Sequence, residues 1–216
     1  MNIQRIVTGA YRANAYLVET GGGEAVLIDP GDEAGRLLAA VKAARCRLAA
    51  VFLTHGHLDH LAALPELLAA EPETPVHVAP EDAAWCFTER NDLPPYRTIT
   101  EPPATLRSDL VDGARFAFGP VAFRVLATPG HSPGGVCLLA EGPEGEPPAL
   151  FSGDTLFAGS IGRTDFEGSD ERAMAASLRR LAVLDPELRV LPGHGPATTI
   201  GRERATNPWM HLLGLA

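Results

Sequence analysis

The chain has 216 residues, and its 18 lysines and arginines against 27 aspartates and glutamates give a formal net charge of −9. This acidic balance argues against a nucleic-acid partner, which requires a basic surface. No apolar run approaches the roughly 20 residues of a membrane-spanning helix, and the first ten residues lack the pattern of a secretory signal. Three cysteines without a C-x-x-C pair argue against a disulfide framework. We therefore expect one cytoplasmic domain over residues 1–216, with no membrane partner.

Apolar periodicity predicts strands and helices that alternate along the chain. The strands are expected over residues 14–19, 25–28, 48–53, 75–78, 115–118, 121–127, 136–140, 149–152 and 188–191, and the helices over 32–44, 58–70, 81–87 and 170–184. Ser169 and Asp170 are both candidate caps for the last of these helices. Because several strands are joined by hairpins and others by helices, the pattern favours an α/β (α+β) fold of two mixed sheets with helices outside over one parallel sheet.

The segment His55-Gly56-His57-Leu58-Asp59-His60 directly follows the apolar strand at 48–53. It places four potential metal ligands within six positions, and Gly56 permits an unusual backbone angle at the turn. Imidazole and carboxylate groups suit zinc, iron or manganese. The segment therefore predicts a metal site rather than a packing site.

Three further candidate ligands each follow an apolar strand: His131, Asp154 and His194. Taken singly, each has an ordinary explanation as a loop residue or a turn cap. Strand ends on one rim of a layered sheet are neighbours, however, so these loops can converge with the first motif. Five histidines and two carboxylates exceed what one tetrahedral zinc uses. We therefore expect two ions that share a carboxylate and a hydroxide, an arrangement that points to hydrolysis.

The sequence resembles the metallo-β-lactamase superfamily, in which these ligands appear in the same order. The resemblance extends to the segments at residues 14–18 and 27–31 and implies an αββα sandwich. It implies a first metal held by His55, His57 and His131, a second held by Asp59, His60 and His194, and Asp154 as the bridge between them. It also implies a catalytic role for Asp59, which can orient the nucleophile or pass on its proton.

Within that superfamily, the segments at residues 152–157 and 162–166 resemble the short bacterial glyoxalase II-like (hydroxyacylglutathione hydrolase-like) branch. This resemblance implies a binuclear thioesterase in which a metal-bridging hydroxide attacks a small-molecule thioester. Two divalent ions are expected, with zinc first and iron or manganese as alternatives. Full-length glyoxalase II adds a helical domain that supplies much of its glutathione site, whereas only 22 residues follow His194 here and are expected to form one helix at most. Glutathione therefore stays one candidate thiol carrier among others.

Two other functions stay open on the sequence. A persulfide dioxygenase would hold a single iron through His55, His131 and Asp154, as a triad with open positions for oxygen. A metal-stabilised binding protein without turnover is the other, but structural zinc sites close their coordination with about four ligands. Seven candidate ligands on a loop-lined rim argue against a purely structural metal site.

Some residues beside the ligands have two candidate roles each. Arg163 is a candidate for binding a substrate carboxylate, since a guanidinium group matches one bidentately; an ion pair with Asp165 is the competing interpretation. Asp29 is a candidate to support the ligand loops through hydrogen bonds, against a plain turn role. Phe157 and Phe166 fit either the wall of a cleft or the core. An oligomer is compatible with the sequence.

Overall fold

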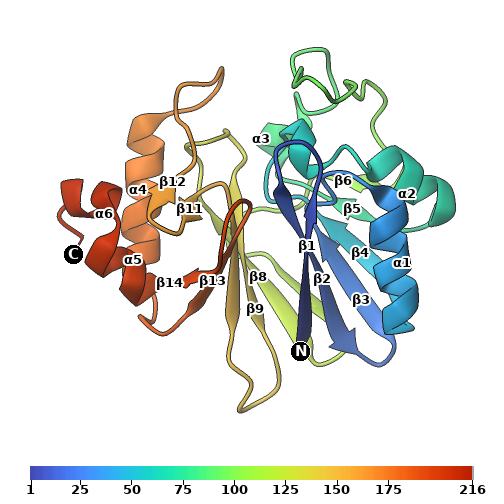
Figure 1. Cartoon of the computed structure of the whole chain (residues 1–216), viewed down its shortest axis with the longest axis horizontal. Coiled ribbons are helices and arrows are strands. Elements are labelled where there is room, and N and C mark those ends of the chain that lie inside the picture. Colours follow the sequence, from blue (N-terminus) through green and yellow to red (C-terminus); the bar gives the residue numbers. More distant parts are fainter. Residues whose placement is uncertain (216) are drawn as a thin grey trace.

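Two six-stranded sheets lie face to face at the centre of the computed structural model, which describes residues 1–215 (Figure 1). The first sheet has the order β1 (Asn2–Thr8), β2 (Ala13–Gly21), β3 (Glu24–Ile28), β4 (Arg47–Phe52), β5 (Val76–His77) and β6 (Leu106–Arg107). The second has the order β14 (Thr198–Thr199), β13 (Arg189–Pro192), β10 (Ala149–Gly153), β9 (Val136–Glu141), β8 (Val121–Ala127) and β7 (Arg115–Phe118). A separate hairpin is formed by β11 (Leu156–Phe157) and β12 (Ser160–Ile161).

Both sheets are mixed, as predicted. In the first sheet, β1, β2 and β3 pair antiparallel, and β3 to β6 pair parallel. In the second sheet, the pairing of β10 with β13 is parallel and the other pairings are antiparallel. Parallel neighbours bring their carboxyl ends to the same edge, so the loops that follow β4, β10 and β13 can carry a shared site.

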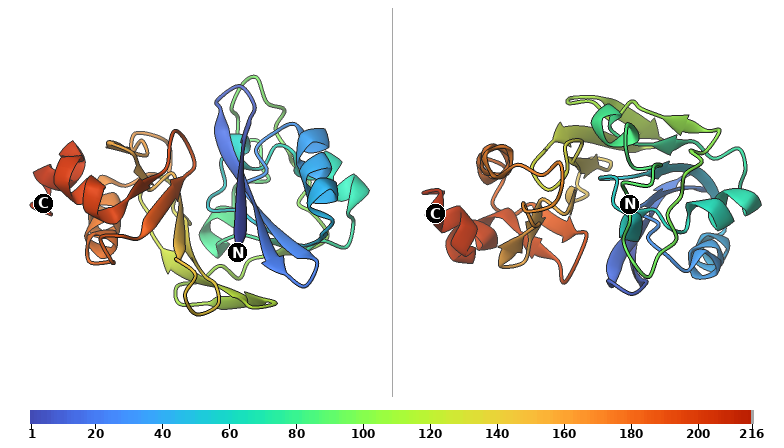
Figure 2. Two further views of the ribbon diagram at one scale, coloured as in Figure 1. Left: turned by 60° about the horizontal axis from the view of Figure 1, so that its bottom comes forward. Right: turned by 90° about the horizontal axis from the view of Figure 1, so that it is seen from above.

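Helices cover the outer face of each sheet (Figures 1 and 2). On the first sheet these are α1 (Ala34–Ala44) and α2 (Leu64–Ala70), and on the second they are α4 (Glu171–Ala182), α5 (Ile200–Thr206) and α6 (Pro208–Leu212). Two short helical segments, η1 (Leu58–His60) and α3 (Pro80–Ala83), lie in the loops after β4 and β5. The predicted sandwich of two mixed sheets with outer helices is confirmed.

Alternation along the strands sorts the apolar side chains into separate cores. In β2, Leu17 packs under the outer helices, while its neighbours Tyr16 and Val18 pack between the sheets. Phe52 is fully buried at the centre of the inter-sheet core, where its ring contacts three phenylalanines and His77. The third core lies beneath α4, α5 and α6. The sheets are therefore held together by aromatic packing that lies below the ligand loops.

Several predicted elements differ from the structure. The helix expected over 58–70 is split into η1 and α2, since Pro65 fits only the first turn of a helix. The helix expected over 81–87 is only the four residues of α3. The tail was expected to form one helix at most, and this was wrong: Pro208 starts a second helix with Asn207 as its cap. The cap of α4 is Asp170, which accepts hydrogen bonds from two backbone N–H groups.

None of the helices in residues 1–215 combines the length and apolar character needed to cross a bilayer.

Candidate metal centre

The predicted ligands come from four loops at one edge of the sandwich. His55 and His57 follow β4, and Asp59 and His60 lie in the short helix η1. The other three follow strands of the second sheet, with His131 after β8, Asp154 after β10 and His194 after β13. Parallel pairing aligns Gly153 with Pro192, which brings the Asp154 and His194 loops together. The structure therefore brings all seven predicted residues into one cluster.

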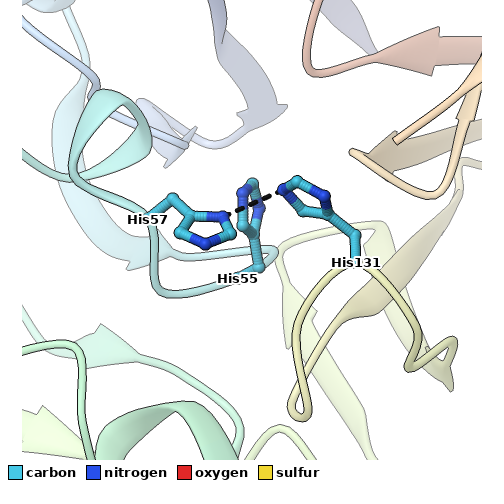
Figure 3. Close-up of side chains that lie close together, drawn as sticks. All are labelled: His55, His57 and His131. Carbon is cyan, nitrogen blue, oxygen red and sulfur yellow. Dashed lines mark hydrogen bonds between the residues drawn. The ribbon is translucent and has the colours of Figure 1, made fainter. Parts of the chain in front are cut away.

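The first group in the cluster consists of His55, His57 and His131, whose potential ligand atoms all lie within 4.8 Å of one another. Figure 3 shows the three rings facing a common centre, with a hydrogen bond of 2.9 Å between His57 Nδ1 and His131 Nε2. The ring of His55 meets each of the other two edge to face. Three imidazoles from two different sheets thus offer nitrogen atoms to one point.

The second group consists of Asp59, His60 and His194, and its ligand atoms also lie within 4.8 Å of one another. His194 Nε2 lies 3.2 Å from Asp59 Oδ2 and 3.3 Å from His60 Nε2. Asp154 stands between the two groups. Its Oδ1 lies 3.5 Å from His60 Nε2, and its Oδ2 lies 3.5 Å from His131 Nε2. One carboxylate therefore reaches both groups.

Within residues 1–215, two buried atoms at the centre of the cluster have no hydrogen-bond partner, namely His55 Nε2 and Asp154 Oδ1. A buried acceptor without a donor is costly in free energy and is rare in folded proteins. Each atom has a lone pair that can coordinate a cation, and the ligand atoms around it are imidazole nitrogens and carboxylate oxygens. This donor set fits zinc, iron or manganese. The cluster thus suits a metal centre.

In four of the histidines, the Nδ1 atom of the ring lies next to an oxygen atom outside the centre of the cluster. These pairs join His55 Nδ1 to Thr54 Oγ1 at 3.1 Å, His60 Nδ1 to Asp29 Oδ2 at 3.1 Å, His131 Nδ1 to the Arg163 carbonyl at 2.8 Å and His194 Nδ1 to the Tyr11 carbonyl at 3.1 Å. A proton held on each Nδ1 leaves Nε2 free to bind an ion. The surroundings therefore select the ligand form of each ring.

A family model described as the Metallo-beta-lactamase superfamily matches residues 8–194. The chain belongs to this superfamily. The hydroxyacylglutathione hydrolase GloC of Haemophilus influenzae is 32% identical over 223 residues, which cover 98% of this chain and 99% of that protein. The chain is accordingly a hydrolase-type enzyme of the superfamily.

Two solved structures share the architecture of this chain. TTHA1623 in a di-iron-bound form is 42% identical and has a TM-score of 0.79, with 95% of this chain and 99% of that one covered. The BLEG-1 B3 metallo-beta-lactamase is 34% identical and has a TM-score of 0.81, with 97% and 99% covered. The first structure is of a di-iron-bound form, and the second is of an enzyme named a β-lactamase. These two comparisons therefore assign neither the ion nor the substrate of this chain.

Burial and charge divide the histidines of this superfamily member into two kinds. Burial and neighbouring imidazoles lower the pKa of His55 well below its ordinary value and that of His57 to about 3. Burial also opposes the charge on His60, but Asp59, Asp154 and Asp29 raise its pKa to about 10. Although burial opposes its ionisation, Asp59 has a pKa held well below the usual range by His60 and His194. The carboxylates around His60 thus favour a positive charge at the second group, which either a proton or a metal ion can supply.

A cavity of about 430 Å³ opens above the cluster, and its floor includes His57, Asp59, His131, Asp154 and His194. Aromatic side chains form much of its wall: Tyr11, Trp85, Phe157 and Phe166. The rings of Trp85 and Phe166 meet the His57 ring edge to face at 5.3 and 5.4 Å. A small organic substrate would therefore lie directly over the predicted ligands.

Arg163 lines this cavity and also pairs with Asp165 through two contacts of 2.9 Å. Its guanidinium carbon lies 4.3 Å from the centre of the Phe166 ring. The ion pair expected with Asp165 is therefore present, at a position from which the side chain can also face a ligand.

Tyr11, Trp85 and Asn91 are among the cavity-lining residues that were not predicted from the sequence. Each lies in a loop far from the ligand motifs along the chain, and none belongs to a recognisable motif. Asp29, in contrast, was singled out, and it accepts hydrogen bonds from both the backbone N–H and the hydroxyl of Thr54.

Proposed function

We propose that the chain is a binuclear, metal-dependent thioester hydrolase of the hydroxyacylglutathione hydrolase type. The observation that carries this proposal is the position of Asp154, whose carboxylate lies between two complete groups of ligands on the floor of the cleft. The 32% identity to the GloC hydrolase supports the choice of thioester. The proposed partner is a small thioester, with glutathione as one thiol carrier, and neither nucleic acid nor membrane takes part.

The proposed ligands of the first ion are His55, His57 and His131. The proposed ligands of the second are Asp59, His60 and His194, and Asp154 would bridge the two ions. Zinc is the proposed ion, and iron or manganese would fit the same donors. Bound there, two such ions would supply an activated water near neutral pH and a Lewis acid for the carbonyl oxygen of the substrate.

The protein's own groups would orient and enclose the reactants. Asp59 lies on the cavity floor and is ionised, so its carboxylate can accept a hydrogen bond from the attacking water and orient it. The aromatic walls would exclude bulk water around the thioester. Water adds an oxygen to the acyl carbon, the C–S bond breaks, and the products are a carboxylic acid and a thiol. A thiolate leaves readily, so no strong general acid is required.

The arrangement favours hydrolysis over the single-iron persulfide dioxygenase. That enzyme would use only His55, His131 and Asp154, which would leave the second group as a buried set of ligand atoms without an ion. The di-iron form of TTHA1623 is a further support for two ions. The proposed location is the cytoplasm, since Cys46, Cys86 and Cys137 are all free thiols.

The test is the loss of the thioester of S-lactoylglutathione, followed with purified protein whose metal content has been measured. The expected result is about two ions per chain and turnover that stops on chelation and returns when zinc is added. Two ions with turnover of β-lactams but not of thioesters would overturn the proposed substrate. One iron per chain with oxygen uptake on glutathione persulfide would overturn the hydrolase.

A further inference from the structure

A buried carboxylate outside the ligand set links the two loops that carry the first group. Asp82 lies in α3 and is fully buried. Its Oδ2 accepts hydrogen bonds from the Gly56 N–H at 2.8 Å and the Ser132 hydroxyl at 2.7 Å. Its Oδ1 accepts from the Gly134 N–H at 2.7 Å and the Trp85 indole N–H at 3.1 Å. One side chain thus joins the His55–His57 loop to the loop of His131.

The absence of a side chain at two glycines permits this close approach. A Cβ atom on Gly134 would lie 2.6 Å from the Asp82 backbone nitrogen and 2.8 Å from its Cγ. A Cβ atom on Gly56 would lie 2.7 Å from the Cβ of Cys86. Both loops therefore approach Asp82 through bare backbone, which places their N–H groups within reach of its carboxylate.

A second buried side chain, Asn91, holds the carbonyl group of Gly56. Asn91 is buried, and its amide donates hydrogen bonds of 2.8 Å to the carbonyls of Gly56 and Cys86. The residue between His55 and His57 is thus fixed by Asp82 at its N–H and by Asn91 at its C=O. Trp85, which donates to Asp82, also packs against the His57 ring.

We propose that Asp82 is a positioning residue that holds His55, His57 and His131 in the arrangement required by the first metal ion. The inference rests on the ligands assigned under the proposed function. The second group is supported by other residues, because His60 contacts Asp29 and His194 contacts the Tyr11 carbonyl. Loss of Asp82 should therefore weaken metal binding at the first group and leave the second unchanged.

The substitution Asp82→Asn tests this with almost no change in size. If the amide oxygen faces Gly134 and Trp85, the amide NH₂ faces the Gly56 N–H, and that hydrogen bond is lost. In the opposite orientation, the NH₂ faces the N–H groups of Gly134 and Trp85. Either way, a backbone donor in a ligand loop has no acceptor. The matched control is Asp109→Asn, which removes the same charge at a carboxylate paired with His77.

The experiment measures zinc affinity against a competing chelator in two backgrounds. His194→Ala disables the second group and isolates the first, and His57→Ala does the reverse. We expect Asp82→Asn to weaken zinc binding about 10- to 100-fold in the His194→Ala background, the range measured for supporting residues of metal sites. We expect no change in the His57→Ala background, and none from Asp109→Asn in either. Circular dichroism checks that each variant is folded.

Unchanged affinity in the His194→Ala background would overturn the inference, and so would an equal loss in both backgrounds. If Asp82→Asn does not fold, Ser132→Ala replaces it, since it removes one of the four hydrogen bonds. It should weaken zinc binding at the first group about fivefold, and no loss would again overturn the inference. Failure to hydrolyse thioesters would contradict the proposed function alone, because these readouts measure zinc binding and not turnover.

Discussion

The carboxylate of Asp29 lies 3.1 Å from Nδ1 of His60, and the other ring nitrogen of that histidine faces Asp154 and Asp59. Asp29 also accepts hydrogen bonds from the backbone N–H and hydroxyl of Thr54, each at 2.7 Å. It follows β3 with a φ of 52°, a left-handed angle that only a few residue types tolerate. One side chain thus orients a predicted ligand and also fixes the start of the first ligand loop.

Replacing Asp29 should therefore weaken the metal centre without unfolding the protein. Asn tolerates the left-handed angle, but its amide group cannot accept hydrogen bonds at both ends. We expect Asp29→Asn to weaken binding of the second ion about 10- to 100-fold, as measured by zinc titration. Asp29→Ala should add a loss of thermal stability from the strained backbone. Full zinc affinity in the Asn variant would contradict a supporting role for Asp29.

Gly193 should tolerate no side chain. A Cβ atom there would lie 2.2 Å from Asp154 Oδ1 and 2.7 Å from a carbon of the His60 ring. We expect Gly193→Ala to displace Asp154 and to lower kcat on the thioester about 100-fold, as misplacement by about 1 Å can do. Gly35→Ala is the control, because that position in α1 has open space and an ordinary φ. It should leave turnover unchanged and raise stability by up to about 1 kcal/mol. Normal metal content and turnover in Gly193→Ala would refute the prediction.

Phe52 should be the most sensitive single position for the packing of one sheet on the other. Its ring lies between β5, β7 and β8 and contacts Phe116, Phe118 and Phe123 at centroid distances of 5.2 to 5.9 Å. We expect Phe52→Ala to lower the free energy of unfolding by about 4 kcal/mol, as for other buried phenylalanines. Urea denaturation measures this. The exposed Val183→Ala should change it by less than about 0.5 kcal/mol, and similar values for both variants would contradict the assignment of the core.

The paired charges at Arg163 and Asp165 should affect substrate binding more than stability. Both side chains are exposed, so breaking their ion pair should leave the melting temperature unchanged. If Arg163 binds an anionic thiol carrier, Arg163→Ala should raise KM about tenfold, the effect of losing one charge-assisted hydrogen bond, with kcat unchanged. Asp165→Asn frees the guanidinium group and should lower KM. An unchanged KM in both variants would leave Arg163 with a local role only.

The ligands could be predicted from the sequence because the loops that carry them directly follow apolar strands. Strand positions are encoded in local alternation, and parallel neighbours end at one edge, so seven polar residues in such places indicate a shared site. The strand β1 was not predicted, since only Ile6 and Thr8 among its seven residues are buried and it lacks the apolar alternation of a half-buried strand. The break before α2 and the second helix of the tail did have signals, in Pro65 and in Asn207 followed by Pro208.

The residues that support the ligands were harder to predict. Asp82 contacts Gly56, 26 positions earlier, and Gly134, 52 positions later. Such contacts depend on how the loops pack after the sheets have come together, and a single sequence carries no periodicity that reports them. Tyr11 contributes through its backbone carbonyl, an atom that every residue possesses.

Each group of ligands takes two members from the half of the chain that forms the first sheet and one from the half that forms the second. His55 and His57 are joined by His131, and Asp59 and His60 are joined by His194. An ion in either group would therefore act as a cross-link between the two sheets. Its binding free energy would add to the stability of their association, by about 4 kcal/mol at a free concentration of one thousand times Kd. Assembly of the sandwich and loading with metal would then be two parts of one linked equilibrium.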